Sequence, residues 1–203
     1  MSAYMRNQFA YLGVKTPLRK ALTRDFLKAT RKVGRIDWDF IEACWQRPER
    51  EFQYLALDYL DALKKTLTPR DVPRIKHLAT TKSWWDTVDN LDTLMGAIAL
   101  AYPEVNTTLV AWSEDENIWL RRLAIDHQLQ RKEQTDTDLL RQIIVSNLDQ
   151  REFFITKAIG WALRDYSKTD PNWVAAFIAE FGDLMAPLSI REASKYLAKT
   201  DSV

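Results

Sequence analysis

The stretch WLRRLA at residues 119–124 has two counterparts in the chain, EFQYLA at residues 51–56 and FFITKA at residues 153–158. The alanines that end these stretches lie 68 and then 34 residues apart. Ala193 follows 35 residues after the last of them, and Asp89-Asn90 falls near the position that the first interval skips. The chain therefore repeats a unit of about 34 residues.

A repeat of this length holds two helices, and stacked repeats of this kind form an α-solenoid. Apolar residues recur with helical periodicity along the whole chain, and no stretch alternates as a strand does. Connections of a few residues make consecutive helices antiparallel neighbours. Because each helix pair buries its apolar face only against its neighbours, the sequence predicts one all-α superhelix of about six pairs, a single domain over residues 1–203.

Thr-Pro steps mark two of the helix starts. Thr16-Pro17 and Thr68-Pro69 each fit an N-cap followed by proline at the first helical position. The predicted helices cover residues 4–12, 17–31, 37–47, 49–66, 69–80, 83–101, 104–113, 116–131, 136–148, 150–167, 171–181 and 188–199.

Composition narrows the function classes. The 203 residues carry a net charge of +1, which neither supports nor excludes nucleic acid, since the basic residues could line one face. No apolar run is long enough to span a membrane. A single cysteine, Cys44, excludes an internal disulfide framework and favours a reducing cytoplasm, and two isolated histidines do not make a metal site. We expect no membrane, metal or cofactor, and a monomer.

The stretch SWWDTVD at residues 83–89 places two tryptophans beside two carboxylates. Trp85 and Asp89 are four residues apart, so they share a helix face. An aromatic plane next to a fixed negative charge suits a cationic ligand. The alternative is a buried tryptophan beside an ordinary surface aspartate, and for Trp85 the residues favour neither. Trp84 and Trp119 are better explained as packing.

Arg122 and Trp161 occupy the next two repeats at a similar depth. Equivalent positions of a solenoid line up along one face, so these side chains would form a mixed aromatic and charged cleft with Trp85 and Asp89. For Arg122 the alternative is a solvated helix face. Gly160, which precedes Trp161, indicates either tight helix packing or the close approach of a ligand.

Several motifs resemble those of the AlkD-type DNA alkylation repair proteins, which are alkylpurine DNA glycosylases built from HEAT-like repeats. The similarity covers almost the whole chain in the family's order. The most specific motifs are TKSWWDTVD at residues 81–89 and KAIGW at residues 157–161. The others are YMRNQF at 4–9, LGVKTP at 12–17, PEREFQ at 48–53, NIWLRR at 117–122 and PLSIREA at 187–193.

The resemblance implies a role for each matching residue. The catalytic aspartate of the family falls on Asp89, and the two tryptophans that contact the DNA backbone and deoxyribose fall on Trp85 and Trp161. The phosphate-binding arginine falls on Arg122, and a tyrosine that contacts the backbone falls on Tyr4.

Two lysines complete the DNA-binding residues expected from the resemblance. Lys157 lies in the KAIGW motif, and Lys15 stands where relatives carry glutamine, so any contact there changes in kind. Family members usually carry about one more helix before the position of Tyr4, so the chain looks short at its N-terminus.

The resemblance further implies hydrolysis of the N-glycosidic bond of N3- and N7-alkylated purines in double-stranded DNA. Such purines are cationic and leave without a general acid, while Asp89 stabilises the oxocarbenium ion and orients water. Two alternatives stay open: a non-enzymatic protein that binds bent or damaged DNA, and a protein-interaction scaffold, which is a common use of such solenoids.

Overall fold

The computed structural model describes residues 2–197, which hold eleven α-helices, several short 3-10 helices and no strand. Neighbouring helices such as α2 and α3, α6 and α7, and α9 and α10 pack side by side, and the predicted all-α solenoid is confirmed. None of the described helices combines the length and the apolar character that crossing a membrane requires. The chain divides into two compact units, Met1–Arg74 and Ile75–Val203, and the single domain predicted for residues 1–203 stays a prediction.

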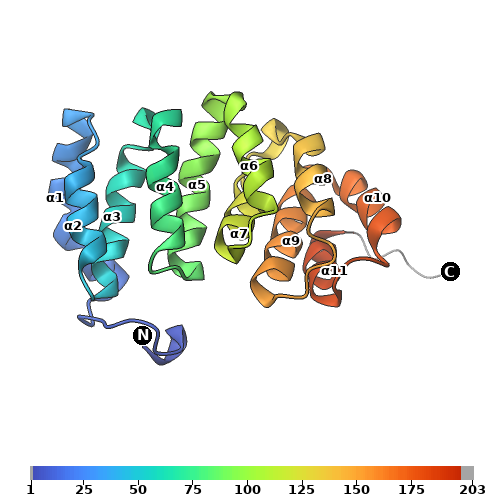
Figure 1. Cartoon of the computed structure of the whole chain (residues 1–203), viewed down its shortest axis with the longest axis horizontal. Coiled ribbons are helices and arrows are strands. Elements are labelled where there is room, and N and C mark those ends of the chain that lie inside the picture. The colour runs from blue at the N-terminus through green and yellow to red at the C-terminus, as the bar shows by residue number, and fades with distance from the viewer. Residues whose placement is uncertain (1, 198–203) are drawn as a thin grey trace. The chain divides into compact units, whose positions relative to one another are not determined.

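The first unit is built on α3, which packs against both α1 and α2 (Figure 1). Its core includes Ile41, Leu57 and Leu60, which are almost fully buried. The Arg19 guanidinium of α1 pairs with the Asp58 carboxylate of α3. The helices of this unit are α1 (Thr16–Val33), α2 (Trp38–Gln46) and α3 (Arg50–Ala62), and α4 (Val72–Thr80) continues from it into the second unit.

The helix predicted over residues 4–12 is wrong. Only Ala3–Met5 forms a 3-10 helix, which ends where Arg6 and Asn7 adopt positive φ angles of 52° and 57°. The chain beyond them is held by α3 instead. The carboxylate of Glu51 accepts hydrogen bonds from the backbone N–H groups of residues 12, 13 and 14 at 2.9–3.1 Å. These contacts satisfy the backbone in a way that local periodicity does not reveal.

The second unit follows the repeat. Helices α5, α7, α9 and α11 pack on one another in turn, and α6, α8 and α10 contact them or each other as the second helices of the pairs (Figure 1). The bounds are α5 (Trp85–Ala101), α6 (Asn106–Ser113), α7 (Ile118–Asp126), α8 (Thr137–Val145), α9 (Phe153–Tyr166), α10 (Pro171–Phe181) and α11 (Pro187–Ala193).

The repeat seen in the sequence has a packing basis. Ala124, Ala158 and Ala193 are fully buried where α7, α9 and α11 meet. Polar contacts also recur at this spacing: Asn147 Nδ2 donates to the Ser113 carbonyl at 2.8 Å, 34 residues away. Small side chains let the helices approach, and polar groups one repeat apart fix the register of the stack.

Several predicted boundaries move inward. Trp84 is an extended residue before α5, with φ −160° and ψ 160°, so only one of the two adjacent tryptophans is helical. The helix predicted over 116–131 ends at Asp126, and Gln130 beyond it has a positive φ of 67°. Lys15, not Thr16, is the N-cap residue of α1. Thr68 is an N-cap residue, as its Pro step predicted, and it also forms a capping box with Asp71. Part of the predicted helix 188–199 lies outside the described residues.

Gly160 permits close packing of α9 against α11. A Cβ atom at this position would lie 2.6 Å from Cβ of Glu192 and 3.1 Å from the Ser189 carbonyl oxygen. Gly inside a helix costs about 1 kcal/mol relative to Ala, and the close approach of two helices explains it. Of the two interpretations of Gly160, helix packing is the one that the structure supports.

Candidate functional site

The centre of the site is an ion pair between neighbouring repeats. Asp89 lies on α5 and Arg122 lies on α7. Arg122 Nε donates to Asp89 Oδ1 at 2.7 Å, and Nη2 donates to Oδ2 at 2.8 Å. This parallel, bidentate geometry fixes the carboxylate plane and is the strongest form of an arginine–carboxylate contact. The predicted neighbourhood of Asp89 and Arg122 is therefore confirmed.

Arg122 does not lie on a solvated helix face, which was the alternative prediction, because its side chain is buried. Its side chain is 2% exposed, and Nη1 donates to the carbonyl oxygen of Phe154 on α9 at 2.7 Å. The guanidinium thus links three successive helices of the stack. A phosphate could reach it only by displacing one of these acceptors, so phosphate binding by Arg122 stays a prediction.

Two further carboxylates lie beside this pair. Asp92 follows Asp89 by three residues on α5, and Asp126 follows Arg122 by four on α7, so each shares a helix face with its partner. One carboxylate oxygen from each of Asp89, Asp92 and Asp126 can be chosen so that all lie within 4.8 Å of one another. A cation could span that distance, and Arg122 already supplies one positive charge there.

Burial makes this group of carboxylates hard to ionise together. Asp92 and Asp126 are 3% and 1% exposed. Burial, together with the charges of Asp126 and Asp89, raises the pKa of Asp92 well above its ordinary value. Burial also raises the pKa of Asp126 to about 7, although Arg122 opposes the shift. Three carboxylates against one guanidinium therefore favour retention of a proton in this group.

Trp161 lies among cations. The guanidinium carbon of Arg122 is 5.4 Å from the centre of its ring, Lys157 Nζ is 5.6 Å away and the guanidinium carbon of Arg164 is 5.6 Å away. Its indole Nε1–H is buried and donates no hydrogen bond. Trp161 thus lies beside Arg122, as predicted, and its ring already contacts cationic side chains of the protein.

Glu192 of α11 binds three basic groups, two of which lie over the ring of Trp161. Lys157 Nζ, Arg164 Nη1 and Lys195 Nζ each lie 2.7 Å from a Glu192 carboxylate oxygen. Burial opposes ionisation of Glu192, but the hydrogen bonds from Lys157 and Lys195 outweigh it and lower its pKa to about 2. We call Lys157, Arg164 and Lys195 the basic cluster. With one carboxylate against three cations, it keeps a net positive charge.

Aromatic rings from three repeats stack beside the pair. Trp84 and Trp119 have ring centres 5.6 Å apart, and Phe154 lies 5.2 Å from the first and 4.9 Å from the second. The three residues are spaced by 35 positions and stand at the starts of α5, α7 and α9. Trp84 and Trp119 are packing residues, as predicted, although both stay partly exposed.

Trp85 is the first residue of α5, one helical turn before Asp89, and is partly exposed. Tyr4 and Lys15 belong to the first unit. Tyr4 lies in the 3-10 helix Ala3–Met5 with 75% of its surface exposed, and Lys15 is exposed at the N-cap of α1. The DNA contacts of these residues stay predictions.

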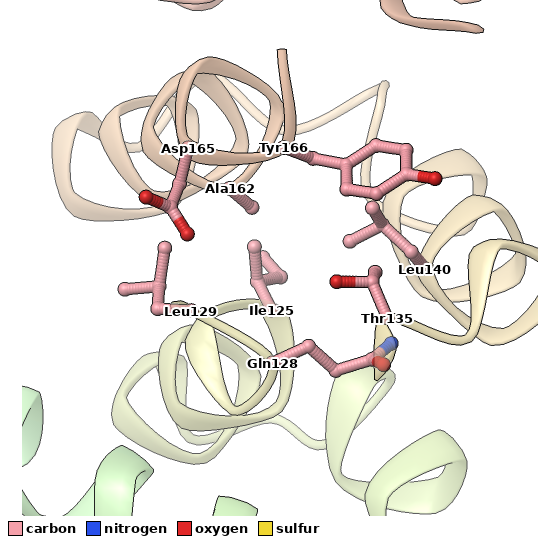
Figure 2. A pocket seen from close by; sticks show the side chains of 8 residues that line it. All are labelled: Ile125, Gln128, Leu129, Thr135, Leu140, Ala162, Asp165 and Tyr166. Atoms are coloured by element: carbon pink, nitrogen blue, oxygen red, sulfur yellow. The ribbon is translucent and has the colours of Figure 1, made fainter. Parts of the chain in front are cut away.

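A separate recess opens where α7, α8 and α9 diverge (Figure 2). None of the predicted site residues lines it. Asp165 at its rim accepts a hydrogen bond from the backbone N–H of Gln130 at 2.6 Å, which ties the turn after α7 to α9. Its lining residues are Ile125, Gln128, Leu129, Thr135, Leu140, Ala162, Asp165 and Tyr166.

Sequence reasoning missed three carboxylates of the site: Asp92, Asp126 and Glu192. The first two could have been found, since they stand at helical i+3 and i+4 spacing from Asp89 and Arg122. For Glu192 the sequence offered only the i+3 spacing to Lys195, because its contacts with Lys157 and Arg164 come from α9, 35 and 28 residues earlier in the chain. The arrangement offers an oriented, partly exposed carboxylate beside an aromatic ring and a positive surface, which suits a polyanion that carries a developing positive charge.

Comparisons with known proteins identify the family of the chain. A family model described as "DNA alkylation repair enzyme" matches residues 1–197 of the chain. A solved structure described as a predicted DNA alkylation repair enzyme from Enterococcus faecalis is 39% identical, with a TM-score of 0.89, and the match covers 98% of this chain and 93% of that one. No match was found among the curated proteins.

Two more distant structures share the fold. AlkD2 from Streptococcus mutans is 16% identical with a TM-score of 0.65, and the match covers 89% of this chain and 97% of that one. The protein smu.31 from Streptococcus mutans UA159 is 18% identical with a TM-score of 0.60, with coverage of 88% and 97%. At these identities the similarity concerns the fold alone.

Proposed function

Because the chain belongs to the DNA alkylation repair enzyme family, we propose that it is a DNA glycosylase that releases N3- and N7-alkylated purines from duplex DNA. The observation that carries this proposal is the bidentate Arg122–Asp89 pair, which presents a fixed carboxylate at a partly exposed position. The Asp89 side chain is 20% exposed, so a sugar and a water molecule can reach it.

The chemistry requires little of the protein. Alkylation at N3 or N7 gives the purine a positive charge, so the C1′–N9 bond breaks with its electron pair moving to the neutral leaving base. The deoxyribose becomes an oxocarbenium ion. Asp89 stabilises this charge and accepts a proton from the water that attacks C1′, which leaves an abasic sugar. No proton has to be delivered to the base.

Selectivity for cationic purines over unmodified ones follows because the lesion, and not the protein, activates the leaving base. An unmodified purine leaves as an anion unless an acid protonates it, and the proposed mechanism assigns no such acid. The cationic lesion is already activated, so electrostatic stabilisation of the sugar is sufficient to select it. Trp85 and Trp161 are proposed to pack against the deoxyribose, with Trp85 one turn from Asp89 on the same helix.

DNA binding is assigned to the basic cluster, with Tyr4 and Lys15 as further contacts. Lys157, Arg164 and Lys195 keep a net positive charge after Glu192 is counted, and their side chains are 24%, 27% and 46% exposed. Phosphates bound there would release counterions. Replacing Arg164 or Lys195 with alanine should therefore weaken duplex binding and flatten the dependence of log K on log salt by about one unit each.

The deciding experiment is base release from a duplex that carries one 7-methylguanine, followed under single-turnover conditions for wild type and Asp89→Asn. We expect the variant to lose at least about 100-fold in rate, the scale of losing one key electrostatic group. Glu180→Gln is the control, because Glu180 forms an exposed pair with Arg141 away from the site and should leave the rate unchanged.

The two alternatives predict different outcomes. A folded wild type that binds damaged duplex but releases no base would be a non-enzymatic damage-binding protein. A folded wild type that neither releases base nor binds DNA in a salt-dependent way would leave the scaffold interpretation. Circular dichroism and thermal unfolding confirm that each variant is folded before its rate is interpreted.

A further inference from the structure

The Asp89–Arg122 pair by itself is electrically neutral. Both oxygens of Asp89 accept hydrogen bonds from the guanidinium, at 2.7 and 2.8 Å. A carboxylate neutralised in this way attracts a developing cation much less than one whose charge is not cancelled. Strong stabilisation of an oxocarbenium ion therefore needs a second group that balances part of the charge of Arg122.

Asp126 has the position of that group. Its Oδ2 lies 3.7 Å from Arg122 Nη2, the same nitrogen that donates to Asp89. The side chain is 1% exposed, and neither carboxylate oxygen accepts a hydrogen bond. A buried carboxylate with two unused acceptor oxygens beside a guanidinium is rare, because such groups are normally satisfied. Asp126 is thus a second acceptor for Arg122 that this arrangement leaves unused.

Asp92 explains why the second acceptor is unused. It is 3% exposed, and its Oδ1 accepts a hydrogen bond from the hydroxyl of its neighbour Thr93 at 3.0 Å. One of its oxygens lies within 4.8 Å of an oxygen of Asp126. Two buried carboxylates this close disfavour each other's ionisation, so one of them keeps a proton more readily than both ionise.

We propose that Asp126 is a positioning residue for the glycosylase reaction: its ionised carboxylate draws Arg122 from Asp89, and a proton held on Asp126 beside the buried Asp92 prevents this. The inference rests on the proposed function. With the proton bound, Arg122 is committed to Asp89 and the pair is neutral. With the proton lost, Arg122 divides between Asp89 and Asp126, and the site gains one more negative charge where the sugar cation forms.

The electrostatics of the site agree with this geometry. Burial raises the pKa of Asp126 to about 7 and that of Asp92 well above its ordinary value, so the proton is lost near neutral pH. Burial lowers the pKa of His127, which follows Asp126, to about 3, so this imidazole stays neutral in that range.

The other helices packed on α7 add few competing charges. Helix α6 has no titratable side chain, and those of α5 that face Asp126 are Asp89 and Asp92. The basic groups of α9 nearest the site are held by Glu192. The titratable side chains are Asp138 and Arg141 on α8, and Lys157, Arg164, Asp165 and Tyr166 on α9.

The test is the pH profile of single-turnover release of 7-methylguanine between about pH 5.5 and 8.5, with spontaneous release measured in parallel and subtracted. Because 7-methylguanine itself loses its N1 proton near neutral pH and then leaves less readily, each enzymatic rate is expressed relative to the spontaneous rate at the same pH, and the expectations refer to that ratio. For wild type we expect the rate to rise roughly tenfold to a plateau, the effect of one nearby charge partly screened by Arg122. Asp126→Asn keeps the shape but removes the charge, and its rate should stay flat at the low-pH value of wild type.

Further variants separate this effect from other causes. In Asp92→Asn, Asp126 no longer competes with a second acid, so the rise should move to lower pH. His77→Gln should keep the wild-type profile, which excludes the exposed histidine of α4 as its source. Equal loss of rate at every pH in Asp126→Asn, or an unchanged midpoint in Asp92→Asn, would overturn the proposal by leaving Asp126 a merely structural role.

A second measurement does not depend on activity. The carboxyl carbons of aspartate are labelled with ¹³C, and the free protein is titrated by NMR. We expect Asp126 to titrate near neutral pH, and the resonance of Asp89 to respond at the same midpoint in wild type but not in Asp126→Asn. If wild type releases no base but these titrations are seen, the proposed function fails and the coupling between Asp126 and the Asp89–Arg122 pair stands. Titration of Asp126 below about pH 5 would overturn the inference.

Discussion

Glu192 holds the ammonium group of Lys157 at 2.7 Å, across the interface of α9 and α11, although the sequence assigns Lys157 to DNA. The same carboxylate also binds Arg164 and Lys195. Glu192 therefore lies where it can both order the basic cluster and cancel part of its charge. This balance can be tested by removing the charge alone.

Glu192→Gln should bind duplex DNA more tightly at low salt, by roughly threefold to tenfold, because the basic cluster gains one net positive charge. The gain should shrink as salt is raised from about 50 to 200 mM. Fluorescence anisotropy of a labelled duplex measures it, with Glu180→Gln as the charge-matched control. Weaker binding by Glu192→Gln would mean that ordering of the cluster matters more than its charge.

The carboxylate of Glu192 should also make the stability of wild type fall at acid pH. The pKa of Glu192 is lowered to about 2 in the folded state, so its contribution to stability is complete above its ordinary pKa of 4.5. That contribution is lost as pH falls from about 4.5 to 2. Urea unfolding across this window should show a smaller loss of stability in Glu192→Gln than in wild type, and parallel curves would contradict the prediction.

Asp126 should produce a slope of the opposite sign. Its pKa is raised from 3.8 to about 7 in the folded state, so the folded protein binds more protons than the unfolded one between these values. The free energy of unfolding therefore falls as pH rises from about 4 to 7, apart from the contributions of other groups. Asp126→Asn should lack this part of the slope, which urea unfolding at several pH values measures. A wild type and variant with the same slope would contradict the raised pKa.

Arg122→Met should destabilise the protein by about 3–5 kcal/mol at neutral pH, since it leaves buried carboxylates without their cation. Lowering the pH toward 5 should recover part of the loss, because protonation removes the charges that Arg122 had balanced. The double variant Arg122→Met/Asp126→Asn should be more stable than Arg122→Met. Chemical unfolding checks each variant, and additive effects in the double variant would show that Arg122 and Asp126 do not interact.

Gly160→Ala tests the packing of α9 on α11. The new Cβ atom would lie 2.6 Å from Cβ of Glu192, so the helices must separate slightly. We expect a net destabilisation of about 1–3 kcal/mol, because the cost of overpacking exceeds the gain in helix propensity of about 1 kcal/mol. Thermal unfolding measures it. A stabilised variant would indicate that α11 moves aside without cost.

The site was predicted only in part. Asp89, Arg122 and Trp161 were named from their motifs, and the structure brings these three together from three helices. The bidentate ion pair between Asp89 and Arg122 was not predicted, nor were the carboxylates Asp92 and Asp126 beside it. A motif names side chains, whereas hydrogen-bond partners depend on distances between helices that a motif does not contain.

The sequence by itself determined the repeated helix pairs, because apolar periodicity and small residues such as Ala124 and Ala158 are local or periodic properties. It did not determine the N-terminal segment, where the helix expected over residues 4–12 is replaced by contacts to Glu51. Nor did it determine the charge state of the site. Burial sets that state, since Asp126 is an ordinary surface-type residue in the sequence and becomes a proton-binding group only when α5, α7 and α9 exclude water around Arg122.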